Sequence, residues 1–206
     1  MLRSIKITEK NDSEFYEYMY KGKPVGNGIN IYNFPLFHQI DDLRDTDQIM
    51  GLYYGMDVGH EVSATTCVCV GLTTNYDVIV LDTYYYSPAG RSRKKAPSEL
   101  AKETAEFIKK THETYGSMIR NITIDSAEGG LRNELKNYHG IRAHPVNKPD
   151  KLDLIDGVQS LLAQGRVFVI KRASNEIFLS QNRNYHYDEK TMETDNVKVY
   201  KHDSLS

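Results

Sequence analysis

The sequence lacks the features that mark membrane-spanning, secreted and zinc-binding chains. No apolar run approaches the roughly 20 residues that a transmembrane helix needs, and the start MLRSIKITEKNDSEFYEYMYKGK has no signal-peptide core. Only two cysteines occur, Cys67 and Cys69, which would share one face of a strand, where a disulfide between them is unfavourable. No second Cys or His pair has zinc-ligand spacing. We therefore expect reduced cysteines that pack in a core, a cytoplasmic compartment and no membrane partner.

Two further features bear on nucleotides and nucleic acids. The chain has no Gly-x-x-x-x-Gly-Lys-Ser/Thr motif, and KGKP at 21–24 is not one, so we expect no ATP hydrolysis. The net charge of −2 does not indicate nucleic-acid binding by itself, although a channel can be locally basic around an acidic centre. One dense basic run exists, formed by Arg91, Arg93, Lys94 and Lys95. It is either a solvated loop before a helix or a loop that contacts phosphates.

The composition is that of a soluble globular chain. Of its 206 residues, 39% are hydrophobic and 26% are charged, which is enough for one proper core. The first fifty residues are rich in Tyr, Gly and Asn and then become acidic. We expect residues 1–50 to form a linker or N-terminal arm with little regular structure, and residues 51–206 to form the folded domain.

From Leu52 onward the pattern alternates between β-branched runs and helical spacing. Strands are predicted at 52–59, 64–73, 76–86, 121–125, 141–146 and 166–170, and helices at 97–116, 126–138, 149–165 and 173–185. The first three strands have short connections, which predicts an antiparallel meander. The order β-β-β-α-β-α-β-α predicts a mixed α/β fold in which helices flank a sheet that is part antiparallel and part parallel.

Three aspartates stand at comparable points of this order. Asp57 lies in the first strand, Asp125 ends the fourth, and Asp203 follows the late strand VKVY. If the first and fourth strands pair, Asp57 and Asp125 lie about 5 Å apart. Like charges so close are destabilising unless a cation neutralises them. Hard oxygen ligands suit Mg²⁺ or Mn²⁺, and two such ions about 4 Å apart would promote phosphodiester cleavage.

The same residues also allow a structural interpretation. Asp is a favoured N-cap, so Asp125 in ITIDSAEGG would serve equally to begin the next helix. Other acidic residues are better explained by a turn, a strand end and a helix surface, namely Asp77, Asp82, Asp153 and Asp156. On pattern alone, both the metal interpretation and the capping interpretation stay open.

Several motifs, taken in order, resemble those of one family. YYGMDVGH, ITIDSAEGGLRNEL, HPVNKPDKLDLIDGVQSLLAQGRVFV and YKHDSLS are similar to successive motifs of the C-terminal nuclease domain of the tailed-bacteriophage terminase large subunit, which has the ribonuclease H-like nuclease fold. EFYEYMYKGKPVGNGINIYNF resembles the segment that joins the ATPase domain to the nuclease. The chain departs from the family at Gly129 and Gly130, where a proline is frequent, and at Tyr200, where some members have histidine.

The resemblance implies a metal-dependent DNA endonuclease that cleaves concatemeric viral DNA during genome packaging. Asp57, Asp125 and Asp203 would be catalytic and would ligate two Mg²⁺ or Mn²⁺ ions. Glu128 and His202 are further candidate ligands, with a first-turn helix acid and a surface or capping histidine as the other interpretations. The candidate DNA contacts are Lys148, Lys151 and the basic run of Arg91, Arg93, Lys94 and Lys95.

The resemblance also implies partners and a location. They are double-stranded DNA, a terminase ATPase domain absent from this chain, the small terminase subunit and the portal protein, in the cytoplasm of an infected bacterial host. The predicted last helix stops at Ser206, so we expect the native protein to continue. Cleavage is expected to be weakly sequence-selective, because nothing resembles a base-reading helix. Alternatives are a junction resolvase or transposase-like nuclease, and a non-catalytic docking module for DNA or portal.

Overall fold

The computed structural model describes residues 2–21, 30–59, 63–146, 151–187 and 199–200. These residues belong to two compact units. The first unit is drawn from the described residues within 1–39, 149–168 and 178–206, and the second from those within 40–148 and 169–177. Both carboxylates of the candidate site that the structure describes, Asp57 and Asp125, belong to the second unit.

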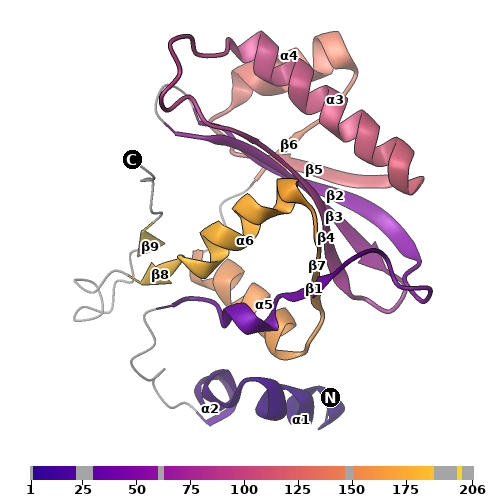
Figure 1. The fold of residues 1–206 in the computed structure, drawn as a ribbon, viewed down its shortest axis with the longest axis vertical. Helices are drawn as coiled ribbons and strands as arrows, with labels where there is room; N and C mark the ends of the chain where they lie inside the picture. Colours follow the sequence, from indigo (N-terminus) through magenta and orange to yellow (C-terminus); the bar gives the residue numbers. More distant parts are fainter. Residues whose placement is uncertain (1, 22–29, 60–62, 147–150, 188–198, 201–206) are drawn as a thin grey trace. The chain divides into compact units, whose positions relative to one another are not determined.

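A seven-stranded sheet has the order β1-β7-β4-β3-β2-β5-β6 (Figure 1). Its strands are β1 (His38–Ile40), β2 (Ile49–Asp57), β3 (Thr65–Thr73), β4 (Val78–Tyr86), β5 (Ile119–Ile124), β6 (His144–Pro145) and β7 (Val167–Ile170). The predicted antiparallel meander is confirmed, because β2 pairs with β3 and β3 with β4 in antiparallel register. The predicted parallel pairing of the first and fourth strands is also confirmed, as β2 with β5. A fully buried residue alternates with a half-buried one along the whole of β3, as expected for a strand inside a covered sheet.

Two helices of the second unit, α3 (Pro97–Tyr115) and α4 (Gly129–His139), cover one face of the sheet (Figure 1). The ends of α3 follow from its sequence. Pro97 occupies the first helical position, the Glu99 carboxylate accepts the Ala96 backbone N–H at 2.8 Å, and Gly116 ends the helix in the left-handed conformation. Its inner face buries Leu100 and Ile108, which fixes α3 on the sheet that carries the aspartates.

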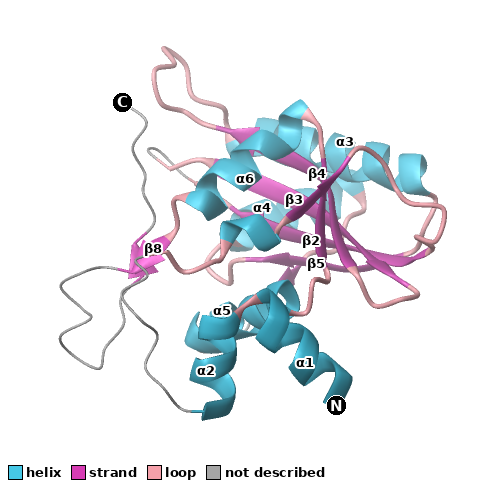
Figure 2. Ribbon diagram, turned by 60° about the horizontal axis from the view of Figure 1, so that its bottom comes forward, coloured by secondary structure: helices cyan, strands magenta, loops and turns pink. Residues whose placement is uncertain are grey.

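The remaining elements are α1 (Leu2–Asn11), α2 (Ser13–Lys21), η1 (Phe34–Leu36), α5 (Lys151–Ala163), η2 (Ala173–Asn175), α6 (Glu176–Arg183), β8 (His186–Tyr187) and β9 (Val199–Tyr200). Helix α1 contacts α2 and α5 within the first unit (Figure 2). The predicted strand VKVY is confirmed in part as β9, which pairs with β8 in antiparallel register. Among the helices of the described residues, none combines the length and apolar character of a membrane span.

The expectation of little regular structure in the first fifty residues is wrong for residues 2–21, which form α1 and α2. The cause lies in local signals at the junction of the two helices. The Asp12 carboxylate accepts the Phe15 backbone N–H at 3.0 Å, which is an N-cap for α2. Thr8 and Phe15 are buried, so each helix has an inner face. That residues 1–50 connect to an ATPase domain stays a prediction.

The two cysteines are free, fully buried residues of β3, as the sequence predicts. Burial disfavours the thiolate, which raises the pKa of Cys69 from 9.0 to about 11 and also raises the pKa of Cys67. The unfolded chain therefore loses these protons at lower pH than the folded chain does.

This difference predicts a loss of stability at alkaline pH. The stability contributed by a protonated Cys69 is complete below pH 9.0 and is lost as the pH rises towards about 11. Between about pH 8 and pH 10 we expect the free energy of unfolding to fall by about 1 kcal/mol from this group, measured by urea denaturation. Cys69→Ala should be less stable at pH 8 but should show a smaller further loss. An equal loss in both chains would contradict the expectation.

A buried polar cluster joins β4 to the segment after β7. The Asp82 carboxylate pairs with Arg172 at 3.2 Å and accepts the Ser174 hydroxyl. The sequence interpretation of Asp82 as a strand-end residue is wrong, because it lies inside β4 and is buried. Fully buried Asn175 donates to the Ile170 carbonyl at 2.8 Å and accepts the Thr83 hydroxyl at 2.8 Å.

We expect Asn175→Ala to lower the free energy of unfolding by about 2 kcal/mol, because it leaves buried groups on β4 and β7 without partners. Chemical denaturation monitored by circular dichroism measures the change. Asn137→Ala is the matched control, since Asn137 is exposed on α4 and alanine is the better helix former. A loss in Asn175→Ala no larger than that in the control would contradict the expectation.

Candidate metal centre

Asp57 and Asp125 lie next to each other at one end of the sheet. Met56 on β2 pairs with Ile124 on β5 in parallel register, so the next residue of each chain segment is an aspartate. Neighbouring strands are about 4.8 Å apart. Both aspartates line a cleft of about 200 Å³, together with Met56 and Val146. The predicted proximity of these two carboxylates is therefore present in the structure.

The turn after β5 fixes the Asp125 carboxylate. Its Oδ1 atom accepts the Ala127 backbone N–H at 3.0 Å, and its carbonyl accepts the Glu128 N–H at 3.0 Å. This is an Asx-turn, which Asp forms readily. The N-cap residue of α4 is Glu128 and not Asp125, so the helix begins three residues later than the sequence predicts. Asp125 therefore closes a turn in front of α4 and does not cap the helix.

A tight turn fixes Asp57 from the other side. Two residues beyond it, the Gly59 N–H donates to the Thr65 hydroxyl at 3.2 Å, and the same hydroxyl donates to the Gly59 carbonyl at 3.2 Å. Thr65 is fully buried at the start of β3. A Cβ atom on Gly59 would lie 1.9 Å from the Ser63 carbonyl oxygen, so only glycine fits this close approach.

The other predicted ligands do not join this pair among the residues that the structure describes. Glu128 is buried, with 8% of its surface exposed, and it does not line the cleft. Asp203 and His202 lie outside the described residues. Within the described ranges no group of three or more His, Cys, Asp or Glu side chains could hold a metal ion. The described part of the centre is thus a carboxylate pair, and its metal role stays a proposal.

The predicted DNA contacts receive little support from the structure. Arg93 pairs with Glu99 at 3.0 Å and Lys95 with Glu103 at 2.6 Å, while the Lys95 ammonium lies 4.3 Å from the centre of the Tyr86 ring. The Arg91 guanidinium lies 5.3 Å from the same ring. These contacts favour the interpretation of residues 91–95 as a loop held against the protein. Lys148 lies outside the described residues, and Lys151 begins α5 in the first unit.

A pair of carboxylates fits a hard divalent cation. Mg²⁺ prefers oxygen ligands and is commonly held by one or two carboxylates, together with waters and phosphate oxygens of a substrate. The cleft between β2 and β5 offers this donor set on rigid strand ends. A soft or nitrogen-rich donor set, which would indicate zinc or copper, is not found among the residues that line the cleft.

The family described as a terminase RNase H-like domain matches residues 57–204, which is more than half of the chain. The chain belongs to this family. Its matched region begins at Asp57 and includes Asp125. A comparison with curated protein sequences finds no match.

Solved structures of phage terminases share the fold. The chain is similar to a full-length large terminase from a thermophilic bacteriophage, with a TM-score of 0.67 and 21% identity over 83% of this chain and 41% of that one. It is similar to the large terminase nuclease from thermophilic phage G20c, with a TM-score of 0.55 and 17% identity over 84% of this chain and 90% of that one.

A third similar structure is the large terminase nuclease domain from bacteriophage SPP1 with bound Mn, with a TM-score of 0.54 and 18% identity over 76% of this chain and 84% of that one. The chain spans about two fifths of the length of the first of these three proteins, whose share in the match is 41%. The predicted ribonuclease H-like fold and the terminase relationship are confirmed.

Proposed function

We propose that this terminase nuclease domain is a divalent-metal-dependent endodeoxyribonuclease that cuts concatemeric viral DNA during genome packaging. The observation that carries the proposal is the pairing of Met56 with Ile124, which sets Asp57 and Asp125 side by side in one cleft. Membership of the terminase family and the Mn bound to the SPP1 domain support the same chemistry.

Asp57 and Asp125 would hold one or two Mg²⁺ or Mn²⁺ ions, and Asp203 would complete the ligand set. Such ions, when bound, activate a water and stabilise charge on the phosphate during hydrolysis of the P–O bond. The chain itself contributes position. The Asx-turn holds one oxygen of Asp125, and the turn at Gly59 holds the end of β2, so the carboxylates need little reorganisation when a phosphate binds.

The proposed substrate and partners follow from this assignment. The substrate is double-stranded DNA, and the partners are a terminase ATPase domain, the small terminase subunit and the portal protein, in the cytoplasm of an infected bacterial host. Glu128 and His202 are proposed as additional ligands only if they move to the pair or complete it on metal binding. Cleavage without strong sequence preference is expected.

Plasmid cleavage by the 206-residue chain tests the proposed function. We expect supercoiled DNA to become nicked and then linear with Mg²⁺ or Mn²⁺, and to stay intact with EDTA. Cleavage that strongly prefers a four-way junction to linear duplex would favour a resolvase. Absence of cleavage with both ions, in a folded chain, would contradict the nuclease assignment and favour a docking module.

A further inference from the structure

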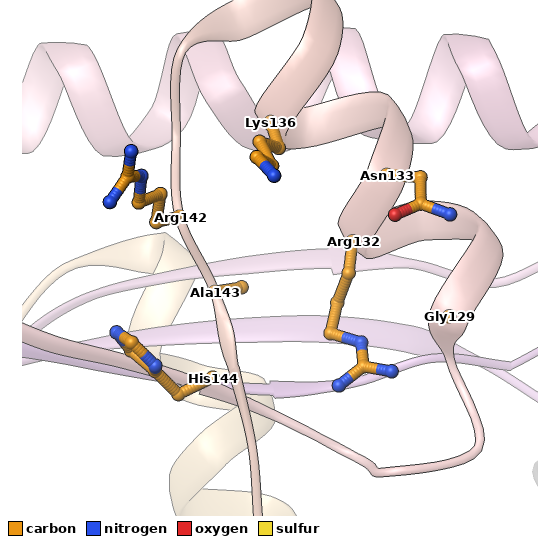
Figure 3. Close-up of a pocket in the computed structure, with 7 residues that line it drawn as sticks. All are labelled: Gly129, Arg132, Asn133, Lys136, Arg142, Ala143 and His144. Carbon is orange, nitrogen blue, oxygen red and sulfur yellow. The ribbon is translucent and has the colours of Figure 1, made fainter.

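A second hollow of about 420 Å³ lies beside the candidate metal centre in the same unit (Figure 3). Arg132 and Lys136 line it from α4, and Arg142 and His144 line it from the segment that enters β6 (Figure 3). We call this hollow the α4–β6 pocket. We infer that it binds backbone phosphates of duplex DNA and is a binding site distinct from the aspartate pair.

The cations of the α4–β6 pocket are not neutralised by the protein. Among the residues that the structure describes, no ion pair and no side-chain hydrogen bond involves Arg132, Lys136 or Arg142. By contrast, Arg44 and Arg172 each bind carboxylates. The pocket therefore concentrates positive charge that has no intramolecular partner within the described part of the chain.

The local spacing makes this concentration unfavourable without a ligand. Arg132 and Lys136 are four residues apart on α4, where like charges face each other and destabilise a helix by about 0.2–0.5 kcal/mol. Arg142 and His144 are two residues apart on an extended segment, so both can face one side. A bound anion would remove the repulsion between the two sets.

The pocket adjoins the aspartate cleft through strand β6. His144 pairs with Thr123, and the Val146 N–H donates to the Ile124 carbonyl at 2.9 Å. His144 lines the α4–β6 pocket and Val146 lines the aspartate cleft, and two residues of strand span about 7 Å. A phosphate chain whose scissile group lies at the aspartates would thus pass the cations of the pocket.

The lining indicates a backbone ligand and not exposed bases. Arg guanidinium groups bind phosphate oxygens through two parallel hydrogen bonds. Proteins that grip single strands stack bases on aromatic rings, and the pocket lining has no Phe, Tyr or Trp. The exposed positions of Lys136, Arg142 and His144 suit a long polyanion that lies across the surface. The identity of the polyanion as DNA rests on the proposed function, whereas the cation cluster does not.

A binding assay without cleavage tests this site. The affinity of the chain for a fluorescent DNA duplex is measured in EDTA by anisotropy at several salt concentrations. The test variant carries Arg132→Gln, Lys136→Gln and Arg142→Gln. The control carries Lys102→Gln, Lys109→Gln and Lys110→Gln, which removes the same charge from exposed positions of α3 in the same unit.

Loss of three phosphate contacts lowers the slope of log affinity against log salt by about 2.7. The affinity lost between about 50 and 200 mM salt should therefore be about 40-fold smaller in the test variant than in the parent, with weaker binding at low salt. The control should follow the parent. Equal slopes in the test variant and the parent, an equal change in the control, or no binding by the parent at low salt would each overturn the inference.

The two proposals fail separately. EDTA removes the metal that cleavage requires, so the binding result does not depend on catalysis. If the test variant loses affinity as expected but the parent never cleaves plasmid with Mg²⁺ or Mn²⁺, the phosphate site stands and the nuclease assignment does not. If the parent cleaves and all slopes agree, the nuclease assignment stands and the site does not.

Discussion

Asp57→Asn and Asp125→Asn are each expected to lower the rate of metal-dependent plasmid cleavage by about 1,000-fold, which corresponds to about 4 kcal/mol of transition-state stabilisation. The two carboxylates lie on adjacent strand ends and line one cleft, so each removal takes away half of the described ligand pair. An amide is close to a carboxylate in size but has no negative charge, so the change tests charge with little change in packing. Cleavage is measured on gels over a series of enzyme concentrations and times.

The double variant sharpens this prediction. If the aspartates act on the same ions, replacing both should cost little more than replacing one, because groups that act as a unit are not additive. Glu113→Gln serves as the control, since Glu113 is exposed on α3 in the same unit. Thermal melting verifies that the variants are folded. A folded Asp57→Asn or Asp125→Asn chain that cleaves at the parent rate would refute the assignment of that residue.

Gly59→Ala is expected to lower the free energy of unfolding by about 3 kcal/mol and to reduce cleavage together with it. The added Cβ would lie 1.9 Å from the Ser63 carbonyl oxygen and 2.2 Å from its carbon. These are backbone atoms, so no side-chain rotation relieves the contact. The turn that holds the end of β2 must open, and Asp57, two residues earlier, loses its position beside Asp125. Urea denaturation and plasmid cleavage measure the two effects.

Gly55→Ala is the matched control for this prediction. Gly55 lies on the same strand, and nothing lies within 4 Å of a Cβ built there. Alanine should therefore be neutral or slightly stabilising at this position, because it restricts the unfolded chain more than glycine does. If Gly59→Ala were as stable as Gly55→Ala, the close approach between Gly59 and Ser63 would not exist in solution.

The arrangement of the sheet was predictable because its signals are local. β-branched runs with short connections define β2, β3 and β4, and Pro97 and Gly116 mark the two ends of α3. The pairing of β2 with β5 follows from this order. It sets Asp57 beside Asp125, although neither segment alone distinguishes a ligand from a capping residue.

Other features depended on contacts that the local pattern does not contain. Asp82 resembles a strand-end residue until Arg172, ninety residues later, is placed against it. Helices α1 and α2 were missed because Tyr, Asn and Gly suggested an arm, although Asp12 carries an N-cap signal. The α4–β6 pocket was missed because its cations come from two elements that are separated by the turn at Gly140. Their spacing on α4, Arg132 with Lys136, was the one signal available.

The most direct test of the account is a crystal structure of the chain soaked with Mn²⁺, with anomalous scattering recorded to locate the metal. The account predicts an anomalous peak bound by the carboxylates of both Asp57 and Asp125, because these groups share one cleft. Octahedral oxygen coordination around that peak would agree with the hard-ligand assignment. A peak that touches neither aspartate, or an Asp125 carboxylate bound to a cationic side chain with no metal beside it, would contradict the central claim.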